Sequence, residues 1–99
     1  MEFEKPIEKG FTIYSKSGCI NCTQIKTLLI ENKIEFKLIS CDEYILEDKE
    51  NFLLFIKQLT NKSQTQFPFI FNNSEFIGGF TQAKEYIFKY CLTFDNNSF

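Results

Sequence analysis

The chain has 99 residues, 43% of them hydrophobic, and a formal net charge of −2. This length suits one domain, and 13 Phe and 4 Tyr are ample for an apolar core. The charges form no basic face and no long run of one sign, so nucleic acid and membrane surfaces are poor candidate partners. We find no signal peptide and no apolar run long enough to span a membrane, and we expect a soluble cytoplasmic protein.

The composition also restricts the chemistry. The sequence contains no His and no Arg, which excludes Cys–His and Ser–His nucleophile pairs and every His-based metal site. Four cysteines are present. In a reducing compartment, cysteines serve catalysis or metal binding more often than structural disulfides.

The first part of the chain predicts a strand, a helix and a second strand. After a polar lead-in, residues 11–14 alternate with the period of a strand and run into a polar loop that contains Lys16 and Gly18. Apolar residues recur at helical spacing over residues 20–32, and alternation returns over residues 34–39. This succession is typical of a right-handed parallel crossover.

The second part predicts a helix, a hairpin and a last helix. The acidic residues 41–50 predict a loop that leads to a helix with one apolar face over residues 52–59. Pro68 interrupts an apolar run, so we expect it just before a strand, with a return strand at residues 75–77. The last helix begins near Phe80, buries Ala83, Ile87 and Tyr90, and gives way to a frayed tail from residue 93.

The predicted order is β-α-β-α-β-β-α within a single domain, with its core at residues 11–91. We therefore expect an α/β fold with a four-stranded mixed sheet and three main helices. Cys19 and Cys22 fall where the first strand passes into the first helix. A Cys-x-x-Cys pair at that junction is typical of the thioredoxin-like fold and indicates redox chemistry.

The two thiols of this pair have different expected roles. Cys19 lies at a helix N-terminus, where unpaired N–H groups and the positive end of the helix dipole favour a thiolate, and Lys16 adds a cation nearby. Cys22 lies one turn inside the helix, so we expect it to react second and resolve a mixed disulfide. Cys19 is then the nucleophile.

A zinc site is the alternative for the same spacing, because Cys-x-x-Cys forms half of many zinc sites. Such a site requires a second close pair, and Cys41 and Cys91 are isolated from each other. Redox chemistry is therefore favoured. We expect Cys91 to be a small buried hydrophobic residue and Cys41 to be exposed in an acidic setting that disfavours a thiolate.

A glycine pair precedes the last helix. Gly78 and Gly79 allow the backbone to approach a ligand closely, and the helix that follows offers free N–H groups to an anion. The alternative interpretation is that the two glycines only allow the chain to turn.

From about Phe11 to Tyr90, the chain resembles the glutaredoxin family. The resemblance rests on residues 14–16 before the Cys-x-x-Cys motif, residues 25–26 after it, and the segments 66–68 and 76–81. Each segment alone is a weak match, whereas the set is specific to the family.

The resemblance implies reduction of protein disulfides and glutathione mixed disulfides, with glutathione as co-substrate. Lys16 would hold the glycyl carboxylate, Phe67 would present its backbone beside a cis-proline, and the helix start would take the γ-glutamyl carboxylate. The implied partners are glutathione and glutathionylated or disulfide-containing proteins, with the chain acting as a monomer. The implied glutathione-binding residues are Lys16, Phe67, Pro68, Gly79, Phe80 and Thr81.

One departure from the family pattern leaves alternatives open. Ile20 and Asn21 replace the usual Pro-Tyr between the cysteines. In some relatives, loss of that proline accompanies a [2Fe–2S] cluster bound by the first cysteine, here Cys19, with glutathione across a dimer. Ile-Asn also resembles electron donors of ribonucleotide reductase that thioredoxin reductase reduces, although those proteins depart from the Gly-Gly-Phe-Thr segment kept here. In addition, Gln66 and Phe67 stand where Thr-Val is usual.

Overall fold

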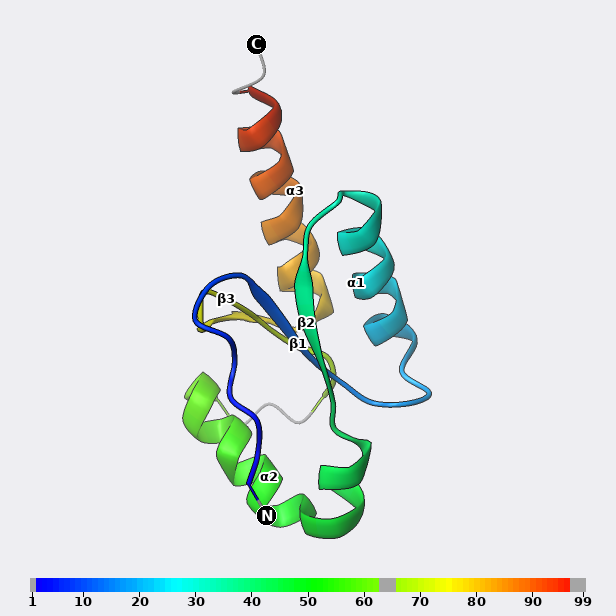
Figure 1. Cartoon of the computed structure of the whole chain (residues 1–99), viewed down its shortest axis with the longest axis vertical. Helices are drawn as coiled ribbons and strands as arrows, with labels where there is room; N and C mark the ends of the chain where they lie inside the picture. Colours follow the sequence, from blue (N-terminus) through cyan, green and yellow to red (C-terminus); the bar gives the residue numbers. More distant parts are fainter. Residues whose placement is uncertain (1, 63–65, 97–99) are drawn as a thin grey trace.

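The computed structural model describes residues 2–62 and 66–96, with side chains as far as Tyr90. It contains one four-stranded sheet with helices packed on both faces (Figure 1). The predicted order of elements is confirmed. The elements are β1 (Phe11–Ser15), α1 (Ile20–Glu31), β2 (Phe36–Ser40), α2 (Asp42–Thr60), β3 (Phe69–Asn72), β4 (Glu75–Gly78) and α3 (Phe80–Asn96).

The strands lie in the order β2-β1-β3-β4. β1 pairs in parallel with β2 and antiparallel with β3, and β3 and β4 form the expected hairpin. The parallel pair requires a crossover connection, and α1 provides it. The mixed sheet with a parallel half and a hairpin half is thus confirmed.

The core has two layers because successive side chains of a strand point to opposite faces. All five residues of β1 are buried, which identifies it as a central strand covered on both faces. One layer packs under α1 and α3, and the other under α2 (Figure 1). The first contains Phe11, Ile13, Ile25, Leu29, Ile70, Ala83 and Ile87, and the second contains Tyr14, Ile39, Cys41, Phe52, Ile56, Phe69 and Phe71.

The acidic segment before residue 50 is helical, so the prediction of a loop there was wrong. α2 begins at Asp42 and is kinked at Asp48, which has φ −153° and ψ 57°. Asp42 and Glu43 occupy its first turn, where carboxylates interact favourably with the helix dipole. Tyr44 and Ile45 pack on the layer under α2, so this turn also makes apolar contacts. The surrounding acidic residues made these contacts hard to predict from the sequence.

The last helix is longer than predicted. α3 continues to Asn96, so the expected tail from residue 93 is helical as far as the structure describes it, and residues 97–99 lie outside the described part. Ala83 and Ile87 are buried as expected, whereas Tyr90 is 45% exposed. The side chain of Cys91 lies outside the described part as well. No helix in the described ranges has the length and apolar character needed to cross a lipid bilayer.

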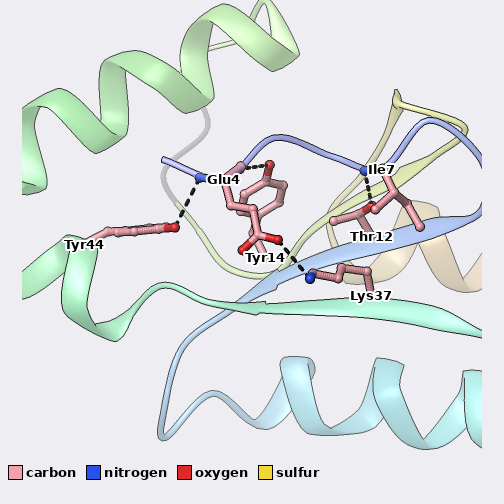
Figure 2. Close-up of polar contacts among 6 residues, drawn as sticks. All are labelled: Glu4, Ile7, Thr12, Tyr14, Lys37 and Tyr44. Atoms are coloured by element: carbon pink, nitrogen blue, oxygen red, sulfur yellow. Dashed lines mark hydrogen bonds and ion pairs between the residues drawn. The ribbon is translucent and has the colours of Figure 1, made fainter. Parts of the chain in front are cut away.

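The N-terminal segment is a strap, here defined as residues 3–7, that contacts β1, β2 and α2 through Glu4. Glu4 makes polar contacts that hold the strap in place (Figure 2). The Tyr14 hydroxyl donates to the Glu4 carbonyl at 2.6 Å, and the Glu4 N–H donates to the Tyr44 hydroxyl at 3.1 Å. The Glu4 carboxylate pairs with the Lys37 ammonium at 2.9 Å.

Apolar contacts add to these polar ones, because the Phe3 ring packs edge-on against Tyr44 and Phe52 at centroid distances of 5.1 and 5.5 Å. The segment described in the sequence as a polar lead-in is therefore part of the folded domain.

We expect Tyr14→Phe to lower the free energy of unfolding by about 0.5–1.5 kcal/mol, the usual contribution of one hydrogen bond. Tyr14 is fully buried, and burial raises the pKa of its phenol, so its hydroxyl stays protonated and donates to Glu4. Urea unfolding at neutral pH measures the change. Tyr90→Phe, at a side chain that is 45% exposed, is the matched control. Equal stability of the Tyr14 variant and the native protein would contradict the role of the strap.

Candidate active site

One edge of the sheet brings together the segments that carry the candidate site residues. Ser15 pairs with Ser40, so β1 and β2 end side by side. Tyr14 lies opposite Phe69, so the loop that leaves β1 meets the segment that enters β3. Gly78 lies opposite Ile70, so β4 also ends at this edge. Residues 16–19, residues 67–68 and the starts of α2 and α3 therefore share this edge.

Cys19 is the N-cap residue of α1, as its position predicted. Its backbone is extended, with φ −99° and ψ 108°, and its sulfur accepts a hydrogen bond from the Cys22 N–H at 3.2 Å. The first turn of α1, all of it described, carries no acidic side chain that would offset the positive end of the helix dipole. Free N–H groups and this dipole favour negative charge on the sulfur.

Cys22 lies in a different environment although it is only one turn away. Its side chain is 2% exposed. Burial raises the pKa of its thiol from 9.0 to about 12, and the hydrogen bond with the Cys19 side chain acts in the same direction. A backbone hydrogen bond from Lys16 opposes the rise but does not cancel it. At neutral pH Cys22 is therefore a protonated thiol.

The loop before Cys19 is fixed by a carboxylate from α2. Asp42 accepts the Ser17 N–H at 2.8 Å, and its second oxygen accepts the Ser17 hydroxyl. These two hydrogen bonds lower the pKa of the Asp42 carboxyl, so it stays ionised. The loop then turns at Gly18, whose φ of +73° favours glycine. Asp42 belongs to no sequence motif. Its place beside this loop follows only from the parallel pairing of β1 with β2, which puts the start of α2 next to the end of β1.

Cys41 is fully buried, so the expectation that it would be exposed was wrong. Its thiol donates to the Ile39 carbonyl at 3.6 Å. Burial, followed by the charge of Asp42, raises the pKa of the thiol to about 12. The expected disfavouring of the thiolate is thus confirmed, with burial as the larger cause, and Cys41 is a core residue.

Lys16 and Phe67 come together across this edge. The Lys16 Nζ atom lies 5.7 Å from the centroid of the Phe67 ring. The Phe67–Pro68 peptide bond is cis, the geometry that the family resemblance implies. Pro68 is buried and directly precedes β3, as predicted.

The start of α3 is built around Gly78 and Gly79. Gly78 has φ +144°, and a Cβ atom there would lie 2.6 Å from Cβ of Gln82, so only glycine fits. The Gly79 N–H donates to Oε1 of Gln82 at 3.2 Å, as in a capping box. The Gly79 donor is thus used within the chain. The N–H groups of Phe80 and Thr81 lie in the first turn of α3, where a helix supplies no partner of its own and can bind an anion. In the sequence, the spacing Gly79-x-x-Gln82 is the signal that could have identified Gln82 as a capping residue of α3.

The donor set of this edge does not fit a metal cluster held by one chain. Within the described ranges, no three Cys, His, Asp or Glu side chains lie close enough to hold a metal ion. A [2Fe–2S] cluster takes four ligands, usually Cys thiolates, and Cys22 is buried. A cluster bound by Cys19 would need its other ligands from outside the chain. The role of Cys19 as an iron ligand stays a prediction.

The fold and the cysteine pair define the class of thioredoxin-like thiol oxidoreductases. A family model described as Glutaredoxin matches residues 11–77, which is most of the chain. The chain belongs to the glutaredoxin family. A search of curated proteins found no match.

Solved structures agree with this assignment. Glutaredoxin 1 from Francisella tularensis, in complex with cacodylate, is 30% identical, with a TM-score of 0.71 over 82% of this chain and 94% of that one. Reduced glutaredoxin from Escherichia coli is 21% identical, with a TM-score of 0.61 over 80% and 93%. A glutaredoxin–glutathione complex from buckwheat is 22% identical, with a TM-score of 0.63 over 77% and 66%. The last two show the fold alone.

We expect iodoacetamide at neutral pH to modify Cys19 and to leave Cys22 unmodified in the folded protein. Cys22 is buried and keeps its proton until the pH approaches about 12, whereas Cys19 is partly exposed at the helix N-terminus. Peptide mapping by mass spectrometry identifies the modified residue, and urea-unfolded protein serves as the control in which both are modified. Preferential modification of Cys22 in the folded protein would contradict this assignment.

Proposed function

We propose that this chain is a glutathione-dependent oxidoreductase of the cytoplasm that reduces protein disulfides and glutathione mixed disulfides through Cys19 and Cys22. The observation that carries the proposal is the Cys19 sulfur at the N-cap of α1 beside a buried, protonated Cys22. Family membership supports it. A monomer is sufficient for this chemistry.

The first step is attack of the Cys19 thiolate on the glutathione sulfur of a mixed disulfide. The bond between Cys19 and glutathione forms, the original disulfide bond breaks, and the protein thiol leaves as a thiolate that takes a proton from water. The N–H groups at the start of α1 stabilise the attacking thiolate. Partial exposure of Cys19 gives the substrate access.

The second step has two routes. A second glutathione thiolate attacks the glutathione sulfur on Cys19, which releases glutathione disulfide and regenerates the Cys19 thiolate. Alternatively Cys22 loses its proton and attacks the Cys19 sulfur, which releases glutathione and leaves a Cys19–Cys22 disulfide for two further glutathiones to reduce. The raised pKa keeps the Cys22 thiol protonated at neutral pH, which disfavours its attack in the second route.

Recognition of glutathione would use positive charge at two separate places on this edge of the sheet. Lys16 would meet the glycyl carboxylate, and the N-terminus of α3 at Phe80 and Thr81 would meet the γ-glutamyl carboxylate. The backbone of Phe67, beside cis Pro68, would pair with the cysteine of glutathione. The buckwheat glutaredoxin, which shares this fold, forms a complex with glutathione and supports the choice of this ligand.

The test is the rate of deglutathionylation of a cysteine peptide, coupled to glutathione and glutathione reductase. We expect the native chain and Cys22→Ser to turn over and Cys19→Ser to fall to the uncatalysed rate, because the route through glutathione needs only Cys19. Cys41→Ser, at a buried thiol outside the mechanism, is the control for general effects of losing a cysteine.

Inactivity of the folded native chain in this assay would overturn the proposal. A thioredoxin-reductase-dependent electron donor to ribonucleotide reductase would then be the function to test.

A further inference from the structure

We propose that the ring of Phe67 is a positioning residue for Lys16, and that it places the ammonium group for the glycyl carboxylate of glutathione. The inference rests on the proposed function and adds a side-chain role to a residue considered so far only for its backbone.

The first observation is the contact itself. The Lys16 Nζ atom lies 5.7 Å from the Phe67 centroid, within the range of a cation–π interaction. Lys16 is exposed, and in the part of the chain that the structure describes it makes no salt bridge within 4.0 Å. The ring therefore orients the charge without neutralising it, and the ammonium keeps its capacity to bind a carboxylate.

The second observation is that the ring has a rigid base. Phe67 stacks on Phe52 with centroids 6.1 Å apart and planes within 10°, and it meets Phe69 edge-on at 4.9 Å. Phe52 and Phe69 are both fully buried in the layer under α2. The orientation of the Phe67 ring is thus set by the core of the domain.

The third observation is that the backbone of the same loop is held independently. Asp42 binds Ser17, the residue after Lys16, through its N–H and its hydroxyl. The loop is fixed at Ser17 and the side chain of Lys16 is guided by Phe67. Loss of the ring should therefore free the ammonium while the Cys19 backbone stays in place.

The test is a double-mutant cycle with Phe67→Leu and Lys16→Gln, using steady-state deglutathionylation of the native protein and its variants. We expect Phe67→Leu to raise KM for the glutathionylated peptide about two- to fivefold with kcat little changed, the equivalent of one exposed cation–π contact. In the Lys16→Gln background, Phe67→Leu should have no further effect. Phe67→Trp, which keeps an aromatic face, should restore the native KM, and Phe88→Leu at an exposed ring is the control.

A purely structural role for Phe67 predicts a different pattern. If the ring acts through Lys16, Phe67→Leu should lower the single-turnover rate of Cys19 with 4,4′-dithiodipyridine, a neutral disulfide with no carboxylate, by a smaller factor than it lowers kcat/KM for the glutathionylated peptide. Equal losses with both substrates, or additive effects of the two substitutions, would overturn the inference.

A spectroscopic readout separates this inference from the proposed function. In the native protein the Lys16 ε-methylene protons should show an upfield ring-current shift that is lost in Phe67→Leu and kept in Phe67→Trp. If that shift is present and glutathione is not a substrate, the proposed function fails and the positioning of Lys16 stands. If glutathione is a substrate and the shift is absent, the positioning role fails and the proposed function stands.

Discussion

The sulfur of Cys19 takes the place that a Ser, Thr, Asp or Asn oxygen usually takes at the start of a helix. It accepts the Cys22 N–H, so the atom proposed to attack the substrate also satisfies a backbone donor of α1. Negative charge on that sulfur strengthens the hydrogen bond and the interaction with the helix dipole together. The rest of the site depends on this cap. The pairing of β1 with β2 and β3 delivers the loop to it, and Asp42 holds the loop through Ser17.

Three cysteines have described side chains, and burial decides which of them can react. Cys22 and Cys41 are enclosed, so each keeps its proton to a pH of about 12. Cys19 is the partly exposed one among the three. Attack by Cys19 requires no loss of a proton from a buried thiol. Resolution by Cys22 does require such a loss, so we propose that Cys19 reacts first. The same burial that stabilises the fold thus distinguishes the thiol proposed to attack from the thiol proposed to resolve the mixed disulfide.

The elements with strong local periodicity were predictable from the sequence. The apolar faces of α1 and α2 at Ile25, Leu29, Phe52 and Ile56 follow helical spacing, and Cys19 falls at a helix start for the same reason. The missed features depend on contacts between distant segments. Glu4 gains its role only beside Tyr14, Tyr44 and Lys37 (Figure 2). Asp42 gains its role only beside Ser17. The first turns of α2 were missed because their charges obscured the apolar contacts of Tyr44 and Ile45.

The central claim is that Cys19 is the thiol that accepts glutathione, and one measurement tests it directly. The Cys22→Ser protein is mixed with glutathione disulfide at neutral pH, and its intact mass and peptide map are followed over time. The account predicts addition of one glutathione, located on Cys19, with Cys41 unmodified. A protein that stays folded yet gains no glutathione, or gains it on Cys41, would contradict the account.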